Sequence, residues 1–526
     1  MGCQTFVLKM HSPTSSVNST SGHQHPQHED GPQVCTNGST IRIGSIGPTP
    51  FASAVLSDVR QINPYARCLV TTFEQTKELS EQASSADSST DWVTQRILSP
   101  FQGNSGIATR AQLEAMTEAH PLPPKKGNRM LRYLQWNFFS VYRKLFTVVL
   151  LLNITAAIVF LVQRRNQNSH IATYQNAATA SSANLCVGVL MRNEHVVNGL
   201  FRLACGLPMW IPLAIRSRAA KIYSYGGMHS ACGVCAVIWY IIFCALMTND
   251  LDGNTTTGTG VTITTAIIIF LLGSIVVFAH PSLRMRYHDA FEMVHRFAGW
   301  TAVACFWVQT FLLASVRATA QHSLGLVLLG TPTFWFLVII TCCIIYPWTR
   351  LRKRKVHVEQ LSSHATRLHF DYRRMTTCSA VRLTDSPLME THGFATIPNY
   401  GDSKGFTVLV SNAGDWTGKI IRNPPTRLWV KGAPTIGVMR VALLFKKVLV
   451  IATGSGIGPC LSFLQSRPVF PTRVLWSAPK PVETYGENII RAVYRADPDA
   501  VIVDTGKTGR GKHSCLGIQY VSGFRR

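Results

Sequence analysis

Residues 448–459 read VLVIATGSGIGP. The apolar run Val448–Ala452 predicts a strand buried on both faces, and the segment Gly458–Gln465 predicts a helix directly after the glycines. Glycines let the backbone approach a diphosphate closely, and the free N–H groups of a helix N-terminus attract negative charge. Pro459 stands where a GxGxxG motif would have its third glycine, and proline suits a first helical turn. The segment Thr453–Pro459 therefore predicts a nucleotide-binding turn, with an ordinary strand-to-helix turn as the alternative.

The segments on both sides of this turn predict two soluble modules. After it, the sequence predicts a strand, a helix and a strand, which together indicate a parallel α/β domain over residues 446–526. Before it, short β-rich segments separated by Pro, Gly and Asn predict a β-barrel domain over residues 356–445. After Asp504 no apolar run is long enough for another strand and helix, so we expect an incomplete nucleotide-binding domain. The predicted elements are strands at Arg367–Tyr372, Ser379–Leu383, Gly405–Ser411, Thr426–Val430, Arg473–Ser477 and Ala500–Val503, and a helix at Tyr485–Arg495.

Long apolar runs occupy the middle of the chain. Each of five runs has enough residues to cross a hydrocarbon core about 30 Å thick. A sixth and weaker candidate contains Arg192, Glu194, His195 and Arg202. Residues 126–350 therefore predict a membrane domain with spans at about 145–162, 183–203, 229–247, 261–279, 298–316 and 325–348.

The distribution of Lys and Arg favours six spans over five. With six spans and both termini inside, the inner flanks carry seventeen of these cations and the outer loops carry three, as the positive-inside rule requires. Asn254 lies in an Asn-Thr-Thr glycosylation sequon, in a loop that this arrangement places outside. The inner cations are Lys125, Lys126, Arg129, Arg132, Arg143, Lys144, Arg216, Arg218, Lys221, Arg284, Arg286, Arg296, Arg350, Arg352, Lys353, Arg354 and Lys355, and the outer ones are Arg164, Arg165 and Arg317. We expect a multi-pass integral membrane protein with cytosolic termini.

The net charge and the polar residues of the N-terminal region limit the kinds of partner that we expect. The net charge of +25 flanks the apolar runs, so it indicates membrane orientation and anionic lipid, and we expect no nucleic acid partner. Residues 1–125 are rich in Ser, Thr, Gln, His and Pro and predict a disordered N-terminal region, with a short helix at Arg110–Ala119. The charged residues of the second span predict either a polar cavity or a partly interfacial segment.

Motifs in the two soluble modules resemble a known superfamily. The glycine turn behind a β-barrel is similar to the ferredoxin-reductase superfamily, in which a flavin-binding barrel precedes a nicotinamide-nucleotide domain. His392-Gly393-Phe394-Ala395-Thr396-Ile397 resembles the His-Pro-Phe-Thr flavin motif of membrane ferric reductases and NADPH oxidases, with Gly in place of Pro. The segments PPTRLWVKGAPTIGVMR and GSGIGP resemble the fungal TmpA-type integral membrane flavoproteins, over roughly Asn128 to Asp504.

The resemblance implies FAD and NAD(P)H as cofactors and assigns the candidate site residues. It places three groups of residues, at the flavin, near it and at the nucleotide diphosphate. These are, in that order, His392, Phe394 and Thr396; Gly432, Pro434, Thr435 and Gly437; and Gly454, Ser455, Gly456 and Gly458. It leaves the electron acceptor unknown.

The histidines depart from the ferric-reductase pattern. Those enzymes carry two histidines thirteen or fourteen residues apart on each of two helices, and the spans here contain no such pair. His229 and His295 lie at the inner membrane boundary, where the alternatives are one shallow haem or interfacial hydrogen bonding.

The sequence therefore predicts a membrane α-helical bundle of about six transmembrane helices, then a β-barrel FAD-type domain and an incomplete α/β nucleotide-binding domain. The favoured function is an oxidoreductase that passes electrons from NAD(P)H through FAD to an unknown acceptor. The alternatives are a non-catalytic membrane signalling or scaffold protein and, from the charged span alone, a transporter.

Overall fold

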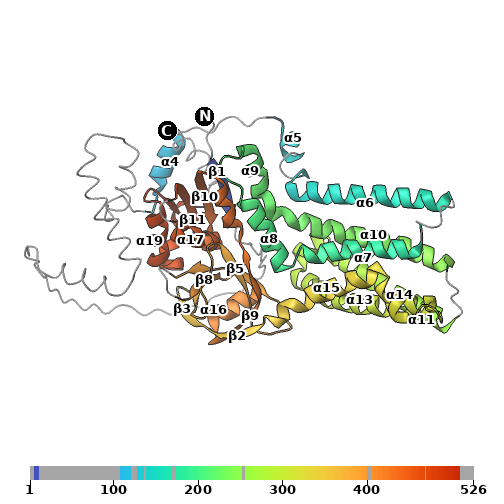
Figure 1. Cartoon of the computed structure of the whole chain (residues 1–526). Helices are drawn as coiled ribbons and strands as arrows, with labels where there is room; N and C mark the ends of the chain where they lie inside the picture. The colour runs from blue at the N-terminus through green and yellow to red at the C-terminus, as the bar shows by residue number, and fades with distance from the viewer. Residues whose placement is uncertain are drawn as a thin grey trace, which may run out of the picture. The chain divides into compact units, whose positions relative to one another are not determined.

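The computed structural model describes residues 5–10, 107–119, 127–134, 138–166, 172–250, 255–399, 404–467 and 470–509. All of these residues belong to one compact unit. They form a set of long helices, two antiparallel sheets and one parallel sheet (Figure 1). Asn254 and most of the predicted disordered region lie outside the described residues, so the glycosylation prediction stays a prediction.

Five helical stretches in the described part of the chain are long and apolar enough to cross a membrane. They are α6 Val141–Arg165, the stretch Leu213–Asp250 that ends in α10 Gly226–Asp250, α11 Thr256–Ala279, α13 His288–Arg317 and α15 Pro332–Thr349. The first four contain a predicted apolar run whole, because twenty or so apolar residues in a helix match the hydrocarbon thickness. The predicted span 325–348 is divided instead: α14 Leu324–Leu329 ends at Gly330, and α15 begins at Pro332. Many apolar side chains on these helices are exposed. On α6, for example, Leu151, Leu152 and Ile158 are each more than half exposed.

The weak sixth span is not one helix, and the prediction of a span at about 183–203 is wrong in its bounds. The structure has α7 Tyr174–Leu190 and α8 Glu194–Cys205, separated by a break at residues 191–193. Asn193 caps α8 by accepting a hydrogen bond from the His195 N–H at 2.9 Å. Asparagine at an N-cap starts a new helix because its side chain satisfies a free N–H group. The apolar helix therefore ends before the charged residues, and Glu194 begins a separate helix.

Polar side chains connect the long helices at a few buried points. Asn153 of α6 accepts hydrogen bonds from Asn184 of α7 at 2.8 Å and from the Trp239 indole of α10 at 3.0 Å. Gln309 of α13 accepts from the Tyr240 hydroxyl at 3.2 Å and donates to Thr265 of α11 at 2.7 Å. Inside an apolar bundle such bonds fix which helix faces meet, since an unpaired amide there would be costly.

The residues after the last long helix form two four-stranded antiparallel sheets. Their orders are β2-β9-β5-β6 and β3-β4-β8-β7. The four predicted strands of this module are confirmed, while β2, β3, β6 and β7 were missed because they are two to four residues long. A closed barrel is not shown. The strands are β2 Arg352–Lys355, β3 His357–Gln360, β4 Ala365–Phe370, β5 Ser379–Thr384, β6 His392–Ala395, β7 Ile397–Pro398, β8 Phe406–Ser411 and β9 Arg427–Ile436.

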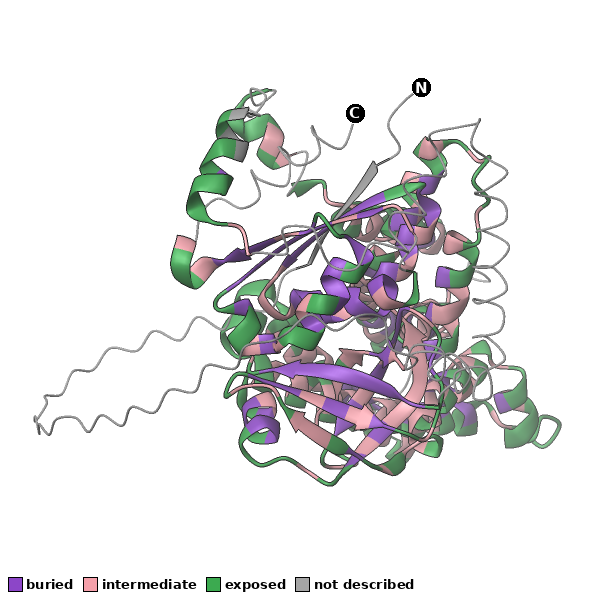
Figure 2. Ribbon diagram, turned by 90° about the vertical axis from the view of Figure 1, so that its left-hand side faces the viewer, coloured by how far each residue is buried: buried purple, intermediate pink, exposed green. Residues whose placement is uncertain are grey.

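The third sheet is parallel, with strand order β1-β10-β11-β12. The strands β10 Lys447–Thr453, β11 Thr472–Ala478 and β12 Val501–Asp504 and the helices α17 Ile457–Ser466 and α19 Glu487–Ala496 confirm the predicted α/β pattern. Its edge strand β1, Thr5–Met10, comes from the region expected to be disordered and pairs in parallel with β10. Figure 2 shows buried residues along the strands and in α17, as expected for a sheet covered by helices.

Short helices complete the described structure. The helix predicted at Arg110–Ala119 is confirmed as α4. The others are α5 Arg129–Tyr133, α9 Leu213–Ala219, η2 Ala220–Tyr225, α12 Pro281–Arg286, α14 Leu324–Leu329, α16 Asp415–Arg422, η3 Val438–Leu444, η4 Gly454–Gly456, α18 Pro481–Tyr485 and α20 Thr505–Thr508.

Candidate functional site

The glycine turn lies where the sequence predicts it, between a buried strand and a helix. β10 ends at Thr453, Gly454–Gly456 form one 3₁₀ turn, and α17 begins at Ile457. Gly454 has φ +50°, a left-handed conformation that disfavours any side chain. No side chain caps α17, and the N–H of its first residue, Ile457, donates to the Ser455 carbonyl. This combination of glycine backbone and open helix N-terminus is the arrangement that holds a diphosphate.

The four predicted residues of the turn contribute in different ways. Gly456 is buried and Ser455 is half-buried. The carbonyl of Gly454 accepts a hydrogen bond from the Trp476 indole at 3.0 Å, which fixes the turn against β11. A Cβ on Gly458 would lie 3.5 Å from Leu409 of β8, an ordinary contact, so the packing of α17 at this position does not require glycine. Gly454 is therefore the position at which the backbone most needs glycine.

An aromatic stack marks the predicted flavin motif on β6. The His392 ring lies on the Trp416 indole, with centroids 4.3 Å apart and planes at 23°, and Phe394 lies 5.8 Å from the same indole. Nε2 of His392 is buried, with no hydrogen-bond partner among the described residues. Burial lowers the pKa of His392, and the nearby carboxylates of Glu390 and Glu292 oppose this shift. The histidine is therefore neutral at pH 7 and can offer a ring nitrogen to a ligand.

Thr396, which follows Ala395 in that motif, forms its side-chain hydrogen bonds within the protein. Its hydroxyl lies 2.8 Å from the Ser379 hydroxyl and donates to the Ser379 carbonyl at 3.0 Å. The Thr396 side chain is fully buried. In this conformation Thr396 links β6 to β5, and a ligand would have to replace one of these bonds to reach it.

The β9 residues predicted near the flavin face the helical domain. Gly432, with φ +75°, lies against the Glu194 carboxylate of α8 and the Arg382 guanidinium of β5, which form an ion pair. The Pro434 carbonyl accepts a hydrogen bond from the Asn198 amide at 2.9 Å, and Thr435 pairs with Ala380. These contacts join β9 to α8.

Gly437 and Cys378 bring the two parts of the site together. The Gly437 N–H donates to the Cys378 carbonyl at 2.6 Å, and the Cys378 N–H donates to the Ser462 hydroxyl of α17 at 2.8 Å. The end of β9, the start of β5 and the helix after the glycine turn thus meet at one residue. The described geometry places α17, the helix after the glycine turn, beside the start of β5 and the end of β9.

Sequence reasoning missed the contacts that four residues of this region make. Trp416 gave a weak signal, since the sequence places it in a Gly-Asp-Trp-Thr turn without indicating that it stacks on His392. Glu194 was marked only as a charged residue of the weak span, and Asn198 and Arg382 gave no usable signal. The break before α8 places Glu194 and Asn198 on a separate helix. There Glu194 pairs with Arg382 of β5, and Asn198 donates to the Pro434 carbonyl of β9.

The two candidate haem histidines lie close to each other. His229 of α10 and His295 of α13 have ring centroids 6.1 Å apart and planes at 71°. Nδ1 of His229 lies 2.7 Å from the Gly188 carbonyl of α7, so this ring is hydrogen-bonded within the protein. Groups of three or more metal-binding side chains are absent among the described residues. No further observation supports a haem here, and we derive no step through one.

Comparison with known proteins gives relatives of one kind. Residues 438–525 match the family model described as the C-terminal domain of adenylate-forming reductase 03009. The chain is 43% identical over 403 residues to adenylate-forming reductase 03009 and 42% identical over 406 residues to adenylate-forming reductase 06235, both from Coprinopsis cinerea. These matches cover 76% and 77% of this chain but 38% and 39% of the relatives, so the chain spans well under half of their length. The relatives are reductases, and they do not confirm the TmpA-type resemblance.

The solved structures that match parts of this chain include the flavohemoglobin from Malassezia yamatoensis with bound FAD and heme. It is 12% identical, covers 62% of this chain and 82% of its own, and has a TM-score of 0.28. At that score the likeness carries no functional argument.

Proposed function

We propose that the chain is an NAD(P)H-dependent flavin oxidoreductase anchored by membrane helices. The observation that carries the proposal is the Gly454–Gly456 turn, which joins a buried parallel strand to a helix with an uncapped N-terminus. The identity to two reductases supports the same class of reaction. Because those relatives are adenylate-forming reductases, we further propose that this chain supplies the reductive chemistry of a protein of that kind.

The residues divide into a diphosphate group and a flavin group. The backbone of Gly454, Ser455 and Gly456 and the first turn of α17 would hold the nucleotide diphosphate. His392 and Phe394, with the missed Trp416, would lie beside the flavin. When bound, FAD supplies the conversion of a two-electron donor to one-electron transfer. The chain itself contributes binding, the neutral His392 ring nitrogen and the orientation of β9 toward the membrane helices.

The membrane arrangement is the second part of the proposal. We propose six crossing segments, with α7 as the additional one beside the five long stretches, and cytosolic ends. α7 has 17 residues and is hydrogen-bonded to α6 and α10 through Asn184 and Ser181, so it is part of the same bundle. The break after α7 keeps Arg192 and Glu194 on the inner side, where the positive-inside rule needs the former. In this proposal the lipid bilayer is a partner of the helices.

A non-catalytic scaffold remains the second candidate, and one observation favours it. The polar groups of Thr396, Pro434 and Gly437 that were expected to meet the flavin are bonded to other parts of the protein. In a scaffold these bonds would be permanent. In an oxidoreductase at least the Thr396 hydroxyl would exchange its partner on flavin binding.

The visible spectrum of the purified protein separates the two candidates. The full chain is purified in detergent with added FAD, and its spectrum is recorded before and after NADPH. Flavin absorption bands that bleach with NADPH support the oxidoreductase, whereas a colourless protein supports the scaffold. Gly456→Val should abolish bleaching, because a branched side chain in the buried turn blocks the diphosphate. Gly273→Ala in α11, where an added Cβ meets no atom within 4 Å, is the matched control and should bleach normally.

A further inference from the structure

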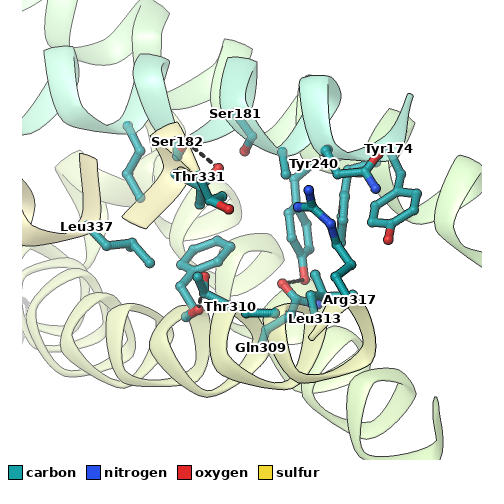
Figure 3. A pocket seen from close by; sticks show the side chains of 17 residues that line it. Tyr174, Ser181, Ser182, Tyr240, Gln309, Thr310, Leu313, Arg317, Thr331 and Leu337 are labelled. Carbon is teal, nitrogen blue, oxygen red and sulfur yellow. Dashed lines mark hydrogen bonds between the residues drawn. The ribbon is translucent and has the colours of Figure 1, made fainter. Parts of the chain in front are cut away.

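A cavity opens inside the helical bundle, away from the nucleotide turn. It contains about 700 Å³ of space not filled by atoms, its open mouth included, and is formed by residues of α7, α10, α13 and α15 and the turn before α15. Figure 3 shows Arg317 extending between Tyr174 and Tyr240, and Leu337 at the far end from it.

The deeper polar groups of the cavity are already paired. Gln309 bonds to Tyr240 and to Thr265, and Ser181 donates to the Ala236 carbonyl at 2.8 Å. Thr310 donates to the Phe306 carbonyl of its own helix at 2.7 Å. A ligand that enters the cavity therefore meets mostly satisfied polar atoms, and its buried part must be apolar to avoid unpaired groups of its own.

The aromatic rings of the cavity also have partners. Tyr240 stacks on Phe243 with centroids 5.3 Å apart and meets Phe306 edge to face at the same distance. Tyr240 and Phe243 belong to α10 and Phe306 belongs to α13, so rings from two helices pack against each other. Because stacked rings do not offer a free slot between two faces, the lining suits a hydrocarbon chain better than a planar ring system.

The mouth carries the one charge of the lining. Among the residues that line the cavity, Arg317 alone has a charged side chain, and it is exposed at the last turn of α13. The neighbouring carboxylate, Asp250, is bound by Arg164 at 2.9 Å. A guanidinium binds a carboxylate through two parallel hydrogen bonds, which makes it a selective partner for that group.

We propose that this cavity binds an amphipathic carboxylate, with the carboxylate on Arg317 and the hydrocarbon chain among Leu185, Phe306 and Leu337. Phe306 and Arg317 are separated by about 16 Å along α13, at about 1.5 Å per residue. That length suits a hydrocarbon chain of medium length. The site is separate from the nucleotide turn and does not depend on the oxidoreductase assignment.

The probe for this site is radiolabelled dodecanoate, added to the full chain in nanodiscs of zwitterionic phosphatidylcholine. We expect saturable binding that Arg317→Gln weakens by about tenfold or more, since a charge-assisted hydrogen bond is lost. Arg165→Gln is the matched control, because Arg165 lies at the same end of the bundle on α6 and outside the cavity lining. It should bind dodecanoate as the unchanged protein does. Ala178→Phe, which places a ring in the cavity, should abolish binding in a protein that still elutes as a single species.

Competition distinguishes the proposed ligand from other occupants. Unlabelled dodecanoate should displace the probe, and the uncharged 1-dodecanol should need at least about a tenfold higher concentration. Stronger displacement by dodecyl phosphate than by dodecanoate would assign the mouth to a lipid phosphate and overturn the carboxylate proposal. No saturable dodecanoate binding, or equal losses in Arg317→Gln and Arg165→Gln, would overturn it as well.

Discussion

The ion pair between Glu194 and Arg382 connects a helix next to the membrane domain with a β-strand, and we expect its loss to destabilise the protein. The Glu194 side chain is 2% exposed and the Arg382 side chain is 32% exposed. Removing one partner of a fully buried pair costs about 3–5 kcal/mol, and an exposed pair contributes about 0–1 kcal/mol. Because water reaches part of the Arg382 side chain, we expect Glu194→Gln to lower the free energy of unfolding by about 2–3 kcal/mol.

A double-mutant cycle measures this pair directly. Thermal unfolding is followed in detergent for Glu194→Gln, Arg382→Met and the double variant. Each single change should lower the melting temperature by several degrees, and the double variant should be more stable than the sum of the two losses predicts, because it leaves no unpaired buried charge. Lys419→Met is the control, since it breaks the exposed Lys419–Asp385 pair of 2.7 Å in the same module and should shift the melting temperature little. Strictly additive losses, or a Glu194→Gln shift as small as that of Lys419→Met, would refute the reasoning.

Three further predictions concern the turn and two titrating groups. Gly454→Ala should destabilise the folded protein by about 1–2 kcal/mol and weaken NADPH binding, measured by unfolding and by titration, because alanine at φ +50° is strained. Burial and the charges of Arg382 and Arg296 lower the pKa of Lys431 to about 8. The unfolded chain then binds the additional proton between pH 8 and the ordinary pKa of 10.5, so stability should rise with pH across that window, and Lys431→Met should remove the rise in pH-dependent melting curves. Burial lowers the pKa of His392, so its contribution to stability is present above about pH 6.5 and is lost as the pH falls below it; His392→Gln should flatten this acid limb.

The helices and strands that could be predicted from the sequence are those with buried side chains along most of their length. β10 and α17 are buried along most of their length, and their continuous apolar runs marked them clearly. The short strands β2 and β3 were missed because RKRK and HVEQ carry polar side chains and lie at sheet edges, where backbone pairing alone defines the strand. The strand β1 was missed because its pairing partner, β10, is more than 400 residues away in the sequence.

The sequence predicted the glycine turn of the candidate site but not the side-chain contacts of Glu194 and His392. The turn at Gly454 is a local feature, so a local pattern identified it. The ion pair of Glu194 depends on where α7 ends, and hydropathy averages over windows longer than the three-residue break at 191–193. The stack of His392 on Trp416 forms because α16 packs against β6. These segments are separated in the sequence, so no local pattern predicts their contact.

The contact of α8 with β9 depends on the similar rise of four helix residues and two strand residues. Glu194 and Asn198 are four residues apart on a helix, a rise of about 6 Å, while Gly432 and Pro434 are two residues apart on a strand, a rise of about 6.6 Å. The two spacings are similar, so Glu194 lies against Gly432 while Asn198 donates to the Pro434 carbonyl and accepts from the Ile436 N–H. One residue inserted between Glu194 and Asn198 would rotate the amide by about 100° and leave it on another face of α8. Relatives that keep this junction should therefore vary in the identity of neighbouring residues far more readily than in the length of this segment.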